Sequence, residues 1–328
     1  MITASLPREL RTRHGLQAIV AAFGVFDGVH RGHLEVLRRV VQRARVCQAA
    51  PVVITFDTHP RAVVATDLAP PPLLCTLPQR LRLLAAAGME AAVLLPFDQA
   101  MAAMPAEDFL RRLVFASDGP RVLGVCIGST WRFGRGGAGT VDTLKQVAAT
   151  QGCDVDSVQE VLIDGRTISS TRIREAIQNG RLEAAAAWLG RPFAVAGIVQ
   201  HGRGVGGPAL GCPTANIQDA DLVMPPDGVY AARARLISRG DRADGIAYVG
   251  QAPTFTRPGE PPPPRLVELH LLDRTEALYG HEIEVEFVRF LRPDQRFASP
   301  AALKEQIAVD IAAARRSLEQ TPEAPTAP

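Results

Sequence analysis

Two histidines three residues apart mark the part of the chain best suited to phosphate chemistry. His30 and His33 follow an apolar run at residues 18–26 and precede a segment with helical spacing at residues 34–41. This pattern predicts a strand, a glycine-rich turn and a helix. A helix N-terminus presents free backbone N–H groups, which suit phosphate, and residues three apart share one helix face. Both imidazoles are therefore candidates to donate hydrogen bonds to one polyphosphate.

A glycine-rich turn with two solvent-exposed histidines is the simpler interpretation of residues 24–33. We would prefer this interpretation if the stretch contained a single histidine. The pattern His-x-Gly-His after a strand and an Asp-Gly turn favours a phosphate site instead. The stretch resembles the signature of the nucleotidyltransferase superfamily. Over its full length it is similar to the opening of bacterial bifunctional riboflavin kinase/FAD synthetases. This resemblance implies that His30 and His33 are catalytic. It also implies that the preceding turn binds nucleotide, through Gly24, Phe26, Asp27 and Gly28.

A second set of candidate phosphate ligands lies at the start of a later predicted helix. Ser169, Ser170 and Thr171 are followed one turn on by Arg174. Hydroxyl side chains at a helix start are ordinary N-caps, so each one alone has a structural explanation. The arginine favours a second phosphate cradle, because its planar guanidinium matches phosphate oxygens. The set resembles the superfamily's Ser-Ser-Thr-x-x-Arg motif. The two motifs together are far more specific than either alone.

The glycine-rich loop at residues 128–139 is a candidate flavin contact. Its aromatic residues Trp131 and Phe133 could bracket a planar ring, although a flexible loop anchored by two aromatics explains the pattern equally well. The loop is similar to the family's Gly-x-Asn-Phe-x-Phe-Gly segment. That similarity implies flavin contacts by Trp131, Phe133 and Thr130, the last in place of the usual Asn. It implies a further flavin contact by Asp57, which follows the predicted strand at residues 51–56.

A glycine-rich segment leads into the string Pro-Thr-Ala-Asn at residues 213–216. Thr214 and Asn216 offer two side-chain oxygens, and Mg²⁺ favours a few protein oxygens together with nucleotide phosphates. A β-loop with a Thr/Asn turn is an equal alternative. The segment resembles the riboflavin kinase signature. The resemblance implies that Thr214 and Asn216 bind Mg²⁺ and that Gly204 and Gly206 contact the nucleotide.

Glu268 is the candidate base of this second region. It lies in an alternating, strand-like segment at residues 267–273, on the face opposite to the apolar residues. An isolated glutamate on a strand is normally just solvated. Here its position matches the family's glutamate, which is proposed to deprotonate the riboflavin 5′-hydroxyl. Geometry must decide that role.

Several positions depart from the family's pattern. Thr58 replaces Pro, Thr130 replaces Asn, Cys212 replaces Phe, Tyr248 replaces a common Asn, and residues 205–207 lack two usual cations. A threonine hydroxyl lacks the second group and the reach of an amide. The departures leave open a specialised paralogue that retains one activity or uses a flavin analogue or another nucleotide. A flavin-binding regulator without turnover is a third possibility, and the retained reactive residues argue against it.

Strands and helices alternate through the first half of the chain. Predicted strands cover residues 18–26, 51–56, 91–95 and 121–127, predicted helices cover 34–41, 79–87, 106–115 and 169–180, and a hairpin covers 158–168. Such alternation predicts an α/β domain with a parallel sheet and right-handed crossovers. Ligands of these sheets bind beyond the carboxyl ends of the strands, where the histidines and the aromatic loop fall. The resemblance implies a Rossmann-like nucleotidyltransferase domain at residues 1–190.

The pattern changes to closely spaced strands after Gly190. Predicted strands cover residues 193–200, 228–236, 245–249, 265–272 and 283–290, and an amphipathic helix covers 301–318. Short strands at this spacing predict a β-barrel or sandwich. The resemblance implies an antiparallel barrel with riboflavin kinase activity at residues 191–318. The Pro-rich tail, residues 319–328, is expected to be disordered, and residues 258–264 are expected to form an exposed loop.

Composition excludes several classes of protein. The chain has 328 residues, 47% of them hydrophobic, and a net charge of +2 with dispersed basic residues, which predicts no nucleic-acid partner. No signal-peptide core or long apolar run is present, so no membrane partner is expected. The five cysteines form no CxxC pair, which fits neither a disulfide framework nor a zinc site. The cytoplasm is the expected location.

The resemblance implies a sequence of two reactions. The barrel would phosphorylate riboflavin with ATP and Mg²⁺ to give FMN. The first domain would then transfer AMP from ATP to FMN, releasing pyrophosphate. Riboflavin, FMN and ATP are the implied partners, with flavoproteins as possible recipients of the products.

Overall fold

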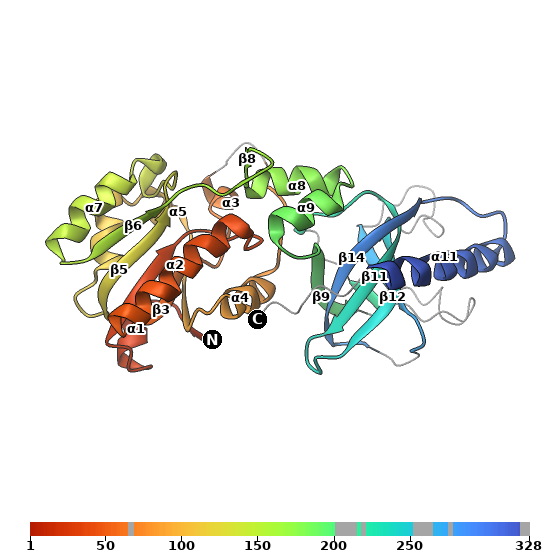
Figure 1. Cartoon of the computed structure of the whole chain (residues 1–328), viewed down its shortest axis with the longest axis horizontal. Coiled ribbons are helices and arrows are strands. Elements are labelled where there is room, and N and C mark those ends of the chain that lie inside the picture. The colour runs from red at the N-terminus through yellow and green to blue at the C-terminus, as the bar shows by residue number, and fades with distance from the viewer. Residues whose placement is uncertain (65–68, 201–214, 218–220, 252–264, 275–277, 322–328) are drawn as a thin grey trace. The chain divides into compact units, whose positions relative to one another are not determined.

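The computed structural model describes residues 1–64, 69–200, 215–217, 221–251, 265–274 and 278–321 (Figure 1). The chain forms two compact units. Among the described residues, one contains Met1–Pro71 and Leu77–Ser170, and the other contains Pro72–Thr76 and those from Thr171 to Thr321. This division assigns residues 171–190 to the second unit, whereas the sequence places a domain boundary near residue 190. That boundary stays a prediction.

The first unit is built on a six-stranded sheet in the order β1-β4-β3-β2-β5-β6. Its strands are β1 (Ile2–Ala4), β2 (Ala18–Phe23), β3 (Ala50–Phe56), β4 (Ala91–Leu95), β5 (Arg121–Gly128) and β6 (Asp154–Val158). Every pairing is parallel, which confirms the predicted parallel sheet. The chain runs outward from β2 through β3 and β4, then returns to β5 on the other side. The carboxyl ends of β2 and β5 are therefore the topological switch point, where such sheets bind ligands.

Helices cover both faces of this sheet. They are α1 (Pro7–Thr12), α2 (Arg31–Cys47), α3 (Arg61–Val64), α4 (Leu77–Ala86), α5 (Gln99–Ala103), α6 (Ala106–Phe109) and α7 (Val141–Thr150). In β2, Ile19 and Ala21 belong to one apolar cluster, whereas Val20 and Ala22 belong to another that includes residues of α2 and α4. Figure 1 shows α2 lying along the sheet. Burial on both faces explains why the strand is a continuous apolar run.

The strand predicted at residues 18–26 ends earlier than expected, at Phe23. Phe26 has φ +53° and Val29 has φ +39°, and the left-handed region cannot continue a β-strand. The predicted helix at 106–115 is also modified, since α6 passes at Leu110 into a π-helical turn that runs to Val114. Residues 24–30 therefore form a turn, and α2 begins at Arg31, earlier than the predicted helix.

The second unit contains a closed six-stranded barrel in the order β10-β13-β12-β11-β14-β9. The strands are β9 (Ala194–Gln200), β10 (Ala215–Ile217), β11 (Gly228–Leu236), β12 (Arg242–Gly250), β13 (Leu266–Leu271) and β14 (Glu282–Pro293). All pairings are antiparallel, and β9 pairs with both β10 and β14. Because the sheet closes on itself, the predicted barrel is confirmed and the alternative, a sandwich, is excluded. Buried and half-buried residues alternate along β13, which separates an inner from an outer face.

The helix α11 (Pro300–Gln320) packs on the outside of the barrel (Figure 1). Ala314 and Leu318 form an apolar cluster with Ala231 of β11 and Ile246 of β12. The helix extends to Gln320, so the first two residues of the predicted disordered tail are helical, while residues 322–328 lie outside the described part. The loop predicted at 258–264 also lies outside it. No helix among the described residues is long and apolar enough to cross a membrane.

A short hairpin and two helices lie along the chain between the parallel sheet and the barrel. The hairpin of β7 (Leu162–Ile163) and β8 (Arg166–Thr167) is followed by α8 (Ser170–Gln178) and α9 (Leu182–Leu189). The strands of this hairpin pair antiparallel, as the sequence predicts. Arg172 of α8 stacks over the ring of Trp188 in α9, with its Cζ atom 5.0 Å from the ring centroid. This cation–π contact links the two helices.

Candidate functional sites

His30 caps the N-terminus of α2. Its Nδ1 accepts a hydrogen bond from the backbone N–H of His33 at 3.3 Å. A Cβ atom at Gly32 would lie 3.1 Å from Cε1 of this ring, so the glycine lets the imidazole fold over the helix start. Because Nδ1 is an acceptor, the proton of neutral His30 resides on Nε2. The local sequence thus orients the His30 ring at the switch point of the sheet.

His33 stacks directly on His30. The ring centroids lie 3.6 Å apart with an interplanar angle of 14°, and Phe26 contacts His33 edge-on at 5.1 Å. Burial, then the charges of His30 and Arg80, hold the pKa of His33 well below its usual range. His33 is therefore neutral at pH 7. Its Nδ1 is buried and has no hydrogen-bond partner in the described structure, which fits a nitrogen that pairs with a ligand.

Arg80 belongs to this site and was not identified from the sequence. It lies on α4, only 6% exposed. It donates to the carbonyl oxygen of Val25 at 2.9 Å and to that of Phe56 at 2.5 Å. Thr55 donates to the same Val25 oxygen at 3.1 Å. Arg80 thus joins the segments that follow β2 and β3. The sequence pattern that could have indicated Arg80 is an arginine among the apolar residues of a predicted helix.

The turn between β2 and α2 is held in a strained conformation. A Cβ atom at Gly24 would lie 3.1 Å from the Phe26 ring, and Gly28 has φ +75°. Ser170 donates its hydroxyl to the backbone oxygen of Asp27 at 3.1 Å, and Asp27 is buried. Non-glycine residues at positive φ are costly and persist where the surrounding structure fixes them. The structure therefore brings Ser170 of the second motif to the turn of the first.

The other residues of the second motif are placed differently. Ser169 is half-buried and Thr171 is exposed. Arg174 is 7% exposed and donates through Nε to the backbone oxygen of Pro72 at 2.6 Å. Thr171, Arg174 and Pro72 all belong to the second compact unit. Phosphate binding by Ser169, Thr171 and Arg174 remains a prediction.

Asp57 and Thr130 both make local hydrogen bonds. Asp57 Oδ1 accepts from the backbone N–H of Thr58 at 2.5 Å and from that of Phe97 at 3.3 Å, which ties the carboxyl ends of β3 and β4 together. The Thr130 hydroxyl donates to Glu160 Oε1 at 3.3 Å, a partner that no local pattern indicates. Both residues are exposed. Their flavin contacts remain predictions.

Trp131 and Phe133 stack on one another, with centroids 4.6 Å apart and an angle of 14° between the rings. This spacing leaves no room for a third ring between them in this structure. Phe133 is 6% exposed and packs against Phe109, and Trp131 also stacks on Phe23 at 5.9 Å. Because aromatic rings gain contact by stacking in the core, these two close up. Flavin contacts by the half-buried Trp131 and by Phe133 remain predictions.

In the barrel, three polar side chains lie side by side on adjacent strands. Glu268 of β13 is directly opposite Asn216 of β10 on one side and Tyr248 of β12 on the other. Each of the three is half-buried and flanked along its strand by buried residues, so all three project from the outer face. Burial raises the pKa of Glu268. Thr214, Gly204 and Gly206, which the sequence assigns to the same region, lie outside the described residues.

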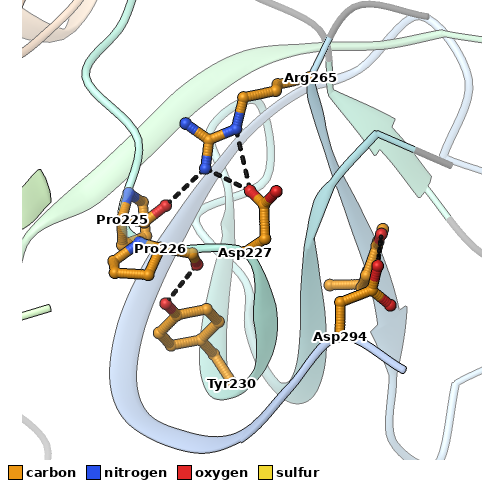
Figure 2. Close-up of polar contacts among 7 residues, drawn as sticks. Pro225, Pro226, Asp227, Tyr230, Arg265 and Asp294 are labelled. Atoms are coloured by element: carbon orange, nitrogen blue, oxygen red, sulfur yellow. Dashed lines mark hydrogen bonds and ion pairs between the residues drawn. The ribbon is translucent and has the colours of Figure 1, made fainter. Parts of the chain in front are cut away.

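A second network fixes the segment that leads into β11 (Figure 2). Arg265, just before β13, donates through Nε to Asp227 at 3.0 Å and through Nη2 to the backbone oxygen of Pro225 at 2.8 Å. Tyr230 donates its hydroxyl to the backbone oxygen of Pro226 at 2.6 Å. Because a guanidinium binds a carboxylate and a carbonyl in fixed directions, this segment is held at the start of the barrel strand. The sequence did not reveal these partners.

The donors around Glu268 suit a hard cation that is held mainly by a nucleotide. In the described part of the chain, no group of three or more His, Cys, Asp or Glu side chains could hold a metal ion. Asn216 supplies one amide oxygen next to the Glu268 carboxylate. Mg²⁺ takes a few protein oxygens and completes its shell with phosphate oxygens and water. The amide oxygen of Asn216 and the carboxylate of Glu268 therefore fit Mg²⁺.

Comparisons with known proteins match both halves of the chain. The model of the FAD synthetase family matches residues 12–172, and the riboflavin kinase model matches residues 189–318. A bifunctional riboflavin kinase/FMN adenylyltransferase of Pseudomonas fluorescens is 35% identical over 307 residues, covering 94% of each chain. That of Bacillus subtilis is 32% identical over 295 residues, covering 89% of this chain and 90% of the relative.

A solved structure shares the fold over nearly the whole chain. It is described as a macrolide-efflux protein from Streptococcus pneumoniae, is 27% identical, and gives a TM-score of 0.74 while covering 96% of this chain and 98% of its own. The histidine turn lies within the residues that the FAD synthetase model matches, and the strand of Glu268 lies within those that the riboflavin kinase model matches. The chain belongs to the family of bifunctional riboflavin kinase/FMN adenylyltransferases.

Proposed function

We propose that this chain makes FAD from riboflavin in two steps. The barrel transfers the γ-phosphoryl group of ATP to the riboflavin 5′-hydroxyl, giving FMN and ADP. The first unit then joins FMN to the AMP part of a second ATP, and pyrophosphate leaves. The observation that supports the proposal most is the His30–His33 stack at the start of α2, with a buried, unpaired Nδ1 on His33.

In the adenylyl step, an FMN phosphate oxygen attacks the α-phosphorus of ATP, and the bond to the pyrophosphate oxygen breaks. His30 donates from Nε2, and His33 pairs through its buried Nδ1 with a phosphate oxygen. The N-terminus of α2 adds its partial positive charge. Donors fixed before the reaction stabilise charge as it develops on the leaving group. Ser170, Thr171 and Arg174 complete the proposed triphosphate contacts.

In the kinase step, Glu268 accepts the proton of the riboflavin 5′-hydroxyl as the oxygen attacks the γ-phosphorus. A raised pKa suits this role, because a general base is most effective when its pKa is close to the working pH. Thr214 and Asn216 are the proposed ligands of Mg²⁺, with ATP as the substrate that brings it. When bound, the ion neutralises charge on the transferring phosphoryl group. Because both steps consume ATP, we place the enzyme in the cytoplasm.

Chromatography of the products tests this function directly. The purified chain is incubated with riboflavin, ATP and Mg²⁺, and separately with FMN, ATP and Mg²⁺. FMN and FAD are expected in the first mixture and FAD in the second. A single product, or a dinucleotide other than FAD, would support the specialised paralogue. Tight flavin binding without any product would leave only the regulator.

A further inference from the structure

Glu160 follows β6 at the carboxyl edge of the parallel sheet. Gly128 of β5 pairs with Val158 of β6, and the backbone N–H of Ser129 donates to the Val158 oxygen at 2.8 Å. Thr130 and Glu160 each lie two residues beyond this pair. Because parallel strands advance by the same distance for each residue, the two side chains stay side by side beyond the strand ends. The Thr130 hydroxyl accordingly donates to Glu160 Oε1 at 3.3 Å.

The other oxygen of this carboxylate binds the hairpin that follows. Thr167 of β8 donates its hydroxyl to Glu160 Oε2 at 3.3 Å. Thr167 pairs with Leu162 of β7, two residues after Glu160, so Thr167 and Glu160 are diagonal neighbours within reach of a long side chain. Three residues after Thr167, Ser170 donates to the backbone oxygen of Asp27 in the histidine turn. Glu160 thus joins the loop after β5 to the segment that leads to Ser170.

The Glu160 carboxylate determines what the Thr130 side chain can offer to a ligand. An ionised carboxylate has no proton to donate, so the single proton of the Thr130 hydroxyl is directed to Glu160. The Thr130 side chain is exposed, and its oxygen keeps a lone pair that can accept a hydrogen bond. Phosphate oxygens act mainly as acceptors, so this lone pair suits a neutral donor instead. In FMN, the ribityl hydroxyls and the imide N–H of the ring are such donors.

We propose that Glu160 is a positioning residue of the adenylyl step, which orients the Thr130 hydroxyl so that its oxygen accepts a hydrogen bond from a neutral donor of FMN. Glu160 acts through Thr130 and does not itself contact the flavin. The inference rests on the proposed FMN adenylyltransferase function. An asparagine at position 130 would fill the same role, because its NH₂ group can donate to Glu160 while its carbonyl oxygen faces the flavin.

A double-mutant cycle between Glu160 and Thr130 tests this role. Initial rates of FAD formation give the KM for FMN and the KM for ATP in Glu160→Ala, in Thr130→Val and in the double variant. Valine keeps the shape of threonine without its hydroxyl. Each single substitution should raise the KM for FMN about three- to tenfold, the usual contribution of one hydrogen bond, and should change kcat and the KM for ATP less than about twofold. The double variant should match Thr130→Val, because no hydroxyl remains to be oriented.

Two controls and one analogue sharpen the cycle. Thr130→Ser keeps the hydroxyl and should keep the KM of the parent chain for FMN. Glu90→Ala is the matched control, because Glu90 is an exposed glutamate of the same unit that directly precedes β4, at the amino edge of the sheet. FMN methylated at the imide nitrogen identifies the donor. If this analogue removes the difference between the parent and Thr130→Val, the donor is the imide N–H, and if the difference persists, the donor is a ribityl hydroxyl.

The proposal is overturned if Glu160→Ala raises the KM for FMN further in the Thr130→Val background, because the glutamate would then act without the threonine. It is also overturned if Glu160→Ala raises the KM for FMN and the KM for ATP alike, or changes neither. Failure of the proposed function would look different, since the parent chain would then make no FAD from FMN and ATP. The same cycle is in that case followed as equilibrium binding of FMN, measured by flavin fluorescence, and it still decides whether Glu160 acts through Thr130.

Discussion

The candidate site of the first unit and that of the barrel are built from different structural elements. In the first unit, loops and a helix start gather at the carboxyl edge of a parallel sheet, and a strained turn presents the stacked His30 and His33. In the barrel, Asn216, Glu268 and Tyr248 project from three adjacent strands whose register aligns them. The first site is therefore determined mainly by local sequence. The second depends on how distant strands pair.

The two reactions should respond separately to changes at the two sites. A change at one site should affect its own step and leave the other intact, because the stacked histidines belong to one compact unit and Glu268 belongs to the other.

Glu268→Gln should reduce FMN formation about 10²–10⁴-fold, the usual contribution of a general base, since the amide cannot accept the hydroxyl proton. FAD formation from supplied FMN should be unchanged. Initial rates of both reactions, with Glu305→Gln on the exposed face of α11 as the control, measure this. Retention of kinase activity in Glu268→Gln would remove the glutamate from the mechanism.

His33→Ala should reduce FAD formation from FMN about 10²–10³-fold, the typical cost of one charge-stabilising donor. FMN formation should be spared. His14→Ala is the matched control, because His14 is an exposed histidine of the same unit. An equal loss of both activities would point to misfolding or to a shared site and would break the comparison.

Arg80→Met should weaken both the stability and the activity of the first unit. The variant leaves the partly buried Phe56 carbonyl without this donor, which costs up to roughly 1–3 kcal/mol, and it frees the turn after Val25. FAD formation should fall about tenfold, a change of roughly 1.4 kcal/mol in the barrier. Thermal unfolding and adenylyl transfer rates measure the two effects. Arg45→Met, at an exposed arginine of α2, serves as the control. If the two variants behave alike, Arg80 does not stabilise the segments that follow β2 and β3.

The first unit should lose stability in mild acid. The pKa of His33 in the folded protein lies well below its usual 6.5, so below about pH 6.5 the unfolded chain binds a proton that the folded chain does not. Stability is therefore complete above pH 6.5 and declines as the pH falls toward the folded-state pKa. Thermal unfolding between pH 5 and 7.5 should show this decline, and His33→Gln should flatten it. A parent profile no steeper than that of His33→Gln would contradict the buried neutral imidazole.

Thr130→Asn should have the smallest effect. An amide offers two donors and a carbonyl where the threonine has one hydroxyl, which donates to Glu160. We expect FAD formation from FMN to rise severalfold, up to about one decade, if the added reach restores a contact to the reacting groups. The kinase step should be unaffected. A fall in FAD formation, or a switch of the preferred nucleotide, would mark Thr130 as an adaptation of a specialised enzyme.

The sequence by itself determined features that depend on neighbouring residues. The apolar run of β2, the glycine turn and the start of α2 are local, because strand periodicity, positive φ and helix capping act over a few residues. His30 and His33 could therefore be placed at a helix start. The parallel sheet followed from alternating strands and helices, and the barrel followed from closely spaced strands. Short or polar strands such as β1, β6 and β10 gave no such signal.

Only the tertiary structure decided which distant residues meet. Arg80 finds the carbonyls of Val25 and Phe56 because strands β2 and β3 end side by side. Trp131 and Phe133 close on each other because core packing favours stacked rings over an open slot. Tyr248 lies next to Glu268 because the register of β12 and β13 aligns them. A one-residue slip of that register would turn Glu268 to the other face, and no local pattern specifies how two distant strands are aligned.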